Sequence, residues 1–213
     1  MSYLRKHKRL LCILIYCALG ASYFAVLYLG KGHHVIGTAL DEKIPFIPAA
    51  VIPYVLWYLY VPLPMLYMSF KDEEIFVRQM KTLFTGMVIA NIFFLIYPTS
   101  IAFRPDTVEG GGILRWICRL IYAVDRPVNV FPSLHCYEAT AIHLSTFGGD
   151  HSRRHRALKA ASGVLCILIC LSTVFMRQHS VLDLISGCGL AAVIYFIVRK
   201  TEKSGDKNDH QTL

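Results

Sequence analysis

Three ionisable residues lie at the ends of long apolar segments in this sequence: His135, His179 and Asp183. His179 and Asp183 are four residues apart, so on a helix they share a face and the carboxylate can accept a hydrogen bond from the imidazole. A histidine oriented in this way presents its other ring nitrogen as a nucleophile or a base. His135 can serve as the opposing acid if the fold brings the two segments together. The three residues therefore predict acid/base catalysis or covalent phosphoryl transfer.

Arginines recur beside these residues, at Arg104, Arg126 and Arg177. The guanidinium group is a planar fork of donors that pairs with two phosphate oxygens at once and stays charged at physiological pH. Fixed donors of this kind stabilise the negative charge that spreads over a phosphoryl group during its transfer. Ser133, which follows Pro132 at the start of an apolar segment, adds a donor at a helix N-terminus, which is itself an anion site. We expect Arg104, Ser133, Arg126 and Arg177 to bind a substrate phosphate.

A zinc site is the competing use of the same cluster, since His135, His179 and Asp183 could supply three ligands. The three neighbouring arginines would repel a metal cation, whereas they suit a phosphate. The sequence therefore favours catalysis without a metal or any other cofactor.

The composition identifies an integral membrane protein. Of the 213 residues, 55% are hydrophobic and only 17% are charged, which is unusual for a soluble domain. A membrane-spanning helix needs roughly 20 apolar residues. One apolar segment also carries His135, Glu138 and His143, and these polar residues predict that it faces the interior of a helix bundle rather than lipid. The sequence predicts an all-α, polytopic protein with six spans, at residues 10–29, 48–69, 82–98, 133–148, 157–175 and 181–198.

Lys and Arg are distributed unevenly between the two sides that these spans define. The side with both termini carries 15 of the 22 Lys and Arg residues, and the opposite side carries seven. By the positive-inside rule, both termini are cytoplasmic and the candidate site residues share the outer face. We predict a cytoplasmic N-terminus (1–9), a six-helix domain (10–200) and a flexible polar tail (201–213) in a plasma membrane protein. The net charge of +8 reflects this topology and gives no reason to invoke nucleic acid.

One extended loop, residues 99–132, lies between the third and fourth predicted spans. Gly110–Gly112 offers a hinge, and residues 113–124 have the pattern of an amphipathic helix with Arg115 and Arg119 on one face. Two interpretations stay open. The helix lies in the outer membrane interface, or it forms a lid or a ramp for lipid beside the site.

Taken together, these motifs resemble the type 2 phosphatidic acid phosphatase superfamily. That family has a Lys-x6-Arg-Pro motif, a Pro-Ser-Gly-His motif and a Ser-Arg-x5-His-x3-Asp motif, in this order on a six-helix membrane core. The sequence has Arg104-Pro105, then Pro132-Ser133-Leu134-His135, and then Ser172 with His179 and Asp183. The resemblance extends over about residues 45–198.

Three positions depart from the family pattern. Tyr97 stands where the family has the lysine, Leu134 replaces the glycine, and Thr173 replaces the arginine. Arg126 and Arg177 could replace the missing cations, which is our inference from the sequence rather than a family property. The Pro-Ser-Leu-His form is similar to a branch that includes inositol phosphorylceramide synthase-like proteins, in which the acceptor can be an alcohol instead of water.

The resemblance implies that His179, oriented by Asp183, attacks phosphorus to form a phosphohistidine. His135 would protonate the leaving oxygen and then activate the acceptor. Water as acceptor gives a phosphatase, a hydroxyl group gives a phosphotransferase, and neither needs a metal. We expect the substrate to be a lipid phosphate or a polyprenyl pyrophosphate whose tail stays in the bilayer, so the partners are this substrate and membrane lipids.

Two other interpretations stay open. Intramembrane His and Asp residues also line proton-coupled transport paths, but transporters tend to have inverted repeats and none is evident in this sequence. The second is a catalytically inactive relative, because the family lysine and arginine are missing. Retention of His135, His179 and Asp183 argues against it.

Overall fold

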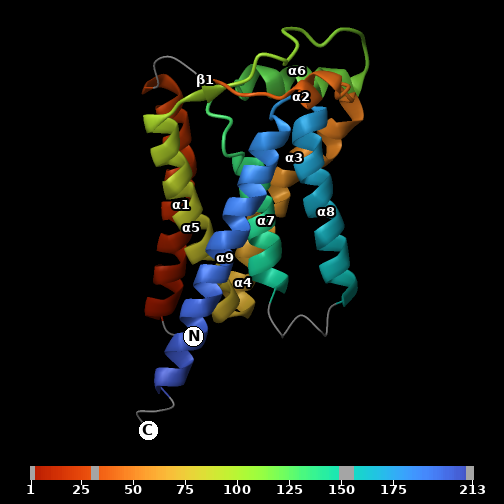
Figure 1. The fold of residues 1–213 in the computed structure, drawn as a ribbon. Coiled ribbons are helices and arrows are strands. Elements are labelled where there is room, and N and C mark those ends of the chain that lie inside the picture. The colour runs from red at the N-terminus through yellow and green to blue at the C-terminus, as the bar shows by residue number, and fades with distance from the viewer. Residues whose placement is uncertain (1–2, 30–33, 149–155, 210–213) are drawn as a thin grey trace.

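The computed structural model describes residues 3–29, 34–148 and 156–209, and most of these residues are helical. This confirms the predicted all-α class. A 3₁₀ turn, η1, covers Pro48–Ala50. The helices are α1 (Tyr3–Leu29), α2 (Ala39–Lys43), α3 (Val51–Tyr60), α4 (Pro62–Lys71), α5 (Glu73–Ile96), α6 (Ile113–Val124), α7 (Leu134–Phe147), α8 (Arg156–Phe175) and α9 (Val181–Asp209) (Figure 1).

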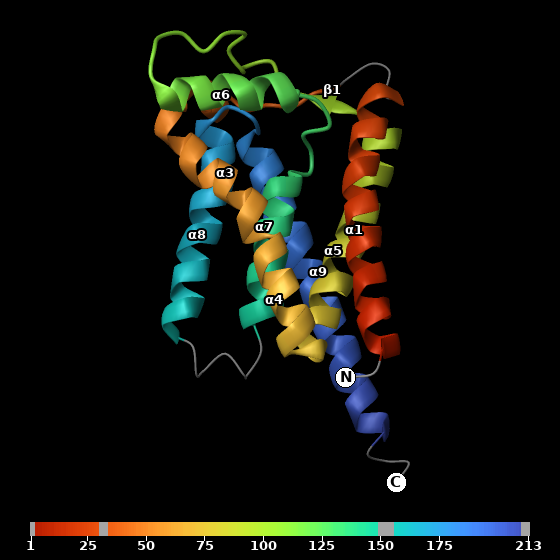
Figure 2. The same cartoon turned by 180° about the vertical axis from the view of Figure 1, so that it is seen from behind.

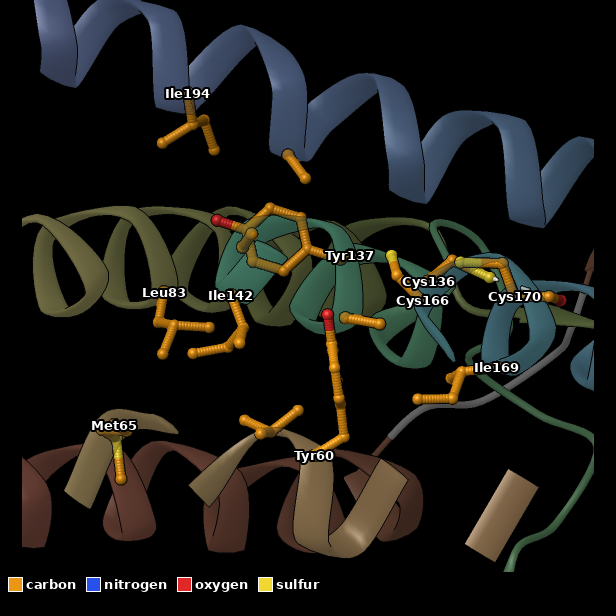
Figure 3. Close-up of a cluster of buried hydrophobic side chains, with 14 of the residues drawn as sticks. Tyr60, Met65, Leu83, Cys136, Tyr137, Ile142, Cys166, Ile169, Cys170 and Ile194 are labelled. Atoms are coloured by element: carbon orange, nitrogen blue, oxygen red, sulfur yellow. Dashed lines mark hydrogen bonds between the residues drawn. The ribbon is translucent and has the colours of Figure 1, made fainter. Parts of the chain in front are cut away.

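Helix α7 occupies the middle of the bundle, where it packs against α5, α8 and α9 (Figure 1). Its side chains Tyr137 and Ile142 lie among Leu83, Ile169 and Ile194, which come from those three helices (Figure 3). Glu138 on the same helix is also buried. The prediction that this polar-containing segment faces the bundle interior is therefore confirmed.

Four helical stretches are long and apolar enough to cross a membrane: Pro48–Lys71, Glu73–Ile96, Arg156–Phe175 and Val181–Glu202. They confirm an integral membrane protein. Helix α7 and the apolar part of α1 are shorter than this criterion requires, so the predicted count of six spans stays a prediction.

The second and third spans differ from their predicted forms. The second is divided at Val61, where α3 ends and α4 begins with Pro62, because proline has no N–H to continue the helical hydrogen bonds. The third begins nine residues before the predicted start at 82, because the Asp72 carboxylate caps it by accepting from the Ile75 N–H at 2.9 Å.

Charged residues in the first turns of α5 lower the hydropathy of this stretch, which explains why the predicted span began only at residue 82. The Arg78 side chain is only 2% exposed, and it forms ion pairs with Glu74 at 2.6 Å and with Glu202 of α9 at 2.8 Å. The buried Arg78 charge is therefore satisfied by two carboxylates, of which Glu74 is largely exposed.

Helix α6 has the predicted bounds and lies across one end of the bundle (Figures 1 and 2). Cys118 on its inner face is buried against Met176 and the Pro48 carbonyl. Trp116 and Leu120 on its other face are exposed. The predicted amphipathic helix is confirmed.

Two short strands, β1 (His34–Val35) and β2 (Thr99–Ser100), pair in parallel near this end. The Thr99 hydroxyl accepts hydrogen bonds from the N–H groups of Val130 at 3.0 Å and Phe131 at 3.1 Å. This pair of strands therefore anchors the segment that leads into α7.

The start of α1 and the end of α9 lie at the other end of the bundle (Figures 1 and 2). Helix α9 continues to Asp209, so the structure describes residues 201–209 of the predicted polar tail as helical. Residues 210–213 and residues 1–2 lie outside the described residues.

Candidate active site

His179 lies in the turn between α8 and α9, and Asp183 lies in the first turn of α9. The His179 Nδ1 atom is 3.1 Å from the Val130 carbonyl oxygen and 3.5 Å from Asp183 Oδ2. A carbonyl oxygen only accepts, so Nδ1 carries the proton and donates to Val130. The neutral imidazole therefore has its lone pair on Nε2, the form that a nucleophile or a base requires.

The Asp183 carboxylate is completely buried. Its Oδ2 atom accepts a hydrogen bond from the Ser180 N–H at 2.8 Å, while Oδ1 has no hydrogen-bond partner among the described residues. Because this carboxylate is both held by the backbone and close to the imidazole, it can stabilise positive charge on His179.

His135 lies in the first turn of α7, after Ser133, whose hydroxyl accepts from the Cys136 N–H as a helix cap. The imidazole of His135 packs between the rings of Tyr54 and Trp57, with centroid distances of 4.7 and 4.4 Å. Its Nε2 atom is buried and has no hydrogen-bond partner in the described part of the chain. The ring centroids of His135 and His179 are 5.7 Å apart, so the structure brings the two predicted histidines together.

Close contact between α7 and α9 sets this distance. The Ser133 N–H donates to the Asp183 carbonyl at 3.2 Å. A side chain at Gly187 would overlap the Ser133 carbonyl oxygen and reach within 3.2 Å of the Cys136 Cβ atom. Glycine at this position therefore allows the two histidine-bearing segments to approach each other.

Arg104 lies beside the His179 turn. Its Nη1 atom donates to the Gln178 side-chain oxygen at 2.7 Å and to the Asp125 carbonyl at 2.6 Å. Its Nη2 atom donates to the Tyr122 carbonyl at 2.6 Å, and the guanidinium stacks 3.8 Å over the Tyr122 ring. Burial lowers the pKa of Arg104, while Tyr122 and Asp125 oppose this shift. The side chain therefore ties the end of α6 to the residue before His179.

The other predicted phosphate-binding residues occupy different surroundings. Arg177 donates to the carbonyls of Ile44 at 2.6 Å and Phe103 at 2.9 Å. It lines a separate cavity of about 610 Å³ beside α2, which contains neither histidine. Arg126 is exposed, whereas Ser133 is buried next to His135. Of the four residues, Arg104 and Ser133 lie near the histidines.

A cavity of about 300 Å³ opens beside His135 and His179. Aromatic rings from α1 and α3 form much of its wall, and the carboxylates of Asp125 and Glu138 also line it. The aromatic residues are Tyr16, Tyr23, Trp57 and Tyr58. The cavity offers a largely apolar space next to the reactive nitrogens.

A sequence model described as the PAP2 superfamily matches residues 31–197. The chain belongs to this superfamily. No curated protein and no solved structure matches the chain significantly. Membership in the PAP2 superfamily confirms the resemblance that the motifs indicated, and it means that the function is of the lipid phosphatase or phosphotransferase type.

The two positions where this PAP2 protein lacks the expected cations lie in different environments. Tyr97 is partly exposed and its ring stacks on His34 with a centroid distance of 3.9 Å. Thr173 is fully buried, and its hydroxyl donates to the Cys170 carbonyl at 2.7 Å. Tyr97 therefore lies at the surface of the protein, whereas Thr173 lies in its interior.

The sequence left open a zinc site made by His135, His179 and Asp183. Within residues 3–29, 34–148 and 156–209, no group of three His, Cys, Asp or Glu residues is arranged to hold a metal ion.

Asp41 of α2 supports the His179 turn of this PAP2 protein, and the sequence motifs did not indicate it. Its carboxylate is 1% exposed and accepts hydrogen bonds at 2.8 Å from both the Ser180 hydroxyl and the Val181 N–H. The N–H and hydroxyl of Thr38 donate to it at 2.6 and 2.9 Å. Burial raises the pKa of Asp41, but these hydrogen bonds lower it more, so it lies below its ordinary value. The local Thr38-x-x-Asp41 capping pattern was the available signal, but it does not indicate a contact with the His179 turn.

Proposed function

We propose that this protein hydrolyses a lipid phosphate or a polyprenyl pyrophosphate through a phosphohistidine formed on His179. The observation that carries the proposal is the hydrogen bond from His179 Nδ1 to the Val130 carbonyl, because it leaves the Nε2 lone pair available. His135, whose Nε2 is unpartnered among the described residues, lines the same cavity as His179. A nucleophile and an acid on opposite sides of a bound phosphorus are what a two-step displacement requires.

In the first step, Nε2 of His179 attacks phosphorus and the bond to the leaving oxygen breaks. A proton from His135 neutralises that oxygen as it departs. In the second step, His135 takes a proton from water, and the oxygen of this water attacks phosphorus and releases His179. The Asp183 carboxylate stabilises the imidazolium in both steps. The amide groups at the start of α7 stabilise the charged oxygens. Arg104 holds the His179 turn through Gln178 and adds positive charge close to the site, without lining the cavity.

A membrane lipid is the expected substrate because the cavity has mostly apolar walls and lies in a protein with four apolar helical stretches. The tail can stay in the bilayer while its phosphate reaches the histidines. The distribution of Lys and Arg supports an active site on the outer face of the plasma membrane.

Transfer to an alcohol is the second candidate function, and the size of the cavity favours it. A water molecule occupies about 30 Å³ of liquid, whereas the cavity measures about 300 Å³. It has room for an acceptor larger than water. Identification of the product, free phosphate or a new phosphorylated alcohol, separates these two functions.

The direct test is turnover of lipid phosphates and pyrophosphates by the purified protein, with and without a chelator. We expect His179→Ala to abolish turnover and to prevent formation of an acid-labile phosphoprotein. His143→Asn is the matched control, because His143 lies on α7 outside the cavity and contacts Ser162 instead. Unchanged phosphate release by His179→Ala would exclude the mechanism. Solute uptake into proteoliposomes without phosphate release would favour a transporter.

A further inference from the structure

The charges that line the cavity beside the histidines do not suit a phosphate alone. Apart from the histidines, the Asp, Glu, Lys or Arg side chains that line it are Asp125 and Glu138, which both carry a carboxyl group, and no Lys or Arg of the described ranges does so. Two carboxylates would repel a phosphate that has no positive charge attached to it. The same two carboxylates would attract a ligand that carries a cationic group in addition to its phosphate.

Glu138 provides the deepest of these carboxylates. Its side chain is 3% exposed, and it follows His135 by three residues, so both lie on the same face of α7. The Tyr16 hydroxyl contributes a hydrogen bond to this carboxylate. Its Oε2 atom is nevertheless buried without a hydrogen-bond partner within the described residues. A buried carboxylate oxygen in this state is costly, and a cation bound in the cavity would satisfy it.

The aromatic walls of the cavity also favour a cation. Tyr16 and Tyr23 of α1 face the cavity together with Trp57 and Tyr58 of α3. The faces of aromatic rings attract ammonium groups, and tryptophan is the strongest of them. Aromatic rings combined with carboxylates therefore form a surface for an organic cation.

We propose that this cavity binds an ammonium group carried by the phosphoryl donor or by the phosphoryl acceptor. Glu138 lies about one helical turn after His135 on α7, a rise of about 4.5 Å, and both side chains line the cavity, so one ligand can contact both. The proposal rests on the proposed function and adds a requirement to it: either the phosphorylated head group or the alcohol acceptor carries an amine. A bare acyl chain is a worse occupant, because it would leave both carboxylates without a partner.

A binding experiment tests the cation preference independently of catalysis. Choline and its neutral carbon analogue 3,3-dimethylbutan-1-ol have almost the same shape and differ in charge. We expect the purified protein in detergent to bind choline about tenfold or more tightly than the neutral analogue, measured by calorimetry or by thermal stabilisation. Glu138→Gln should remove this preference, Trp57→Phe should weaken it, and the exposed Glu109→Gln should leave it unchanged. Equal binding of the two compounds, or full choline preference in Glu138→Gln, would overturn the proposal.

A second experiment identifies the source of the ammonium group. Phosphatidylethanolamine and phosphatidylcholine are offered as donors, and release of diacylglycerol is followed. In a parallel reaction, phosphatidic acid is the donor and labelled ethanolamine is the acceptor. Turnover of an amine-bearing donor lipid, or transfer of phosphate to ethanolamine, supports the proposal and shows whether the ammonium group comes from the donor or from the acceptor. Turnover of phosphatidic acid with water alone, unaffected by either amine, would overturn this proposal and leave the proposed function intact. Choline binding without turnover of any phospholipid would count against the proposed function alone.

Discussion

The Asp41 carboxylate accepts a hydrogen bond from the Ser180 hydroxyl at 2.8 Å, although 139 residues separate the two in the sequence. Ser180 follows His179 directly, and its N–H donates to Asp183. Asp41 and Asp183 therefore hold the same turn from two sides, one from α2 and one from α9. We infer that the orientation of His179 depends on both carboxylates.

Replacement of Asp41 by Asn tests this inference. The amide has one acceptor oxygen, so it cannot replace the contacts with Thr38, Ser180 and Val181 together. We expect a loss of about 1–3 kcal/mol of stability and a larger relative loss of kcat than of substrate affinity. Thermal unfolding and steady-state kinetics measure the two effects. Asp106→Asn, on an exposed loop, is the control, and an Asp41→Asn variant with normal kcat would exclude a positioning role.

The depressed pKa of Asp41 predicts how stability depends on pH. Since the folded protein holds this carboxyl ionised at lower pH than the unfolded chain does, its contribution is complete above the unfolded pKa of about 4. The contribution disappears as the pH falls through the lower folded pKa. Unfolding midpoints of the wild type and Asp41→Asn should therefore differ most near neutral pH and converge below about pH 4. A difference that stays constant down to pH 3 would contradict the assignment.

Asp183→Asn separates orientation of His179 from stabilisation of its charge. The Val130 carbonyl still accepts from Nδ1 in this variant, so the imidazole keeps its tautomer. The negative charge 3.5 Å away is lost. We expect kcat to fall by about 100-fold or more while substrate binding changes little. Trapping of a slowly formed phosphohistidine would agree with this explanation, and an unchanged kcat would show that Asp183 has no role in catalysis.

Gly187→Ala tests whether the close packing of α7 and α9 sets the separation of the histidines. Its methyl group would overlap the Ser133 carbonyl oxygen, so we expect a loss of about 1–3 kcal/mol of stability. The specific activity of the folded protein should also fall, because Ser133 caps the helix that carries His135.

Gly189→Ala is the matched control, because it lies on the same helix and its added methyl group meets nothing within 4 Å. It should keep activity and, as alanine favours helix, gain up to about 1 kcal/mol of stability. Equal behaviour of the two variants in thermal unfolding and in kinetics would contradict the packing argument.

The sequence alone determined the features that depend on local pattern. Apolar runs indicated a membrane protein, and the amphipathic period predicted α6 over residues 113–124. The spacing of His179 and Asp183 predicted that the two side chains lie close together on one helix. They are 3.5 Å apart, but His179 lies in the turn before α9 and only Asp183 is on the helix. Each of these signals is contained within one short segment, where residue type and helical geometry decide the outcome.

Only the tertiary structure decided which distant groups meet. The contacts of His179 with Val130, and of Asp41 with Ser180, join segments that no periodic pattern relates. The same holds for Arg177. Its side chain donates hydrogen bonds to a backbone carbonyl at the end of α2 and does not contact the histidines. The cavity walls likewise combine α1 and α3 with α7. Hydrogen bonds and cavities of this kind depend on how whole helices pack, and the information for that packing is spread over the full chain.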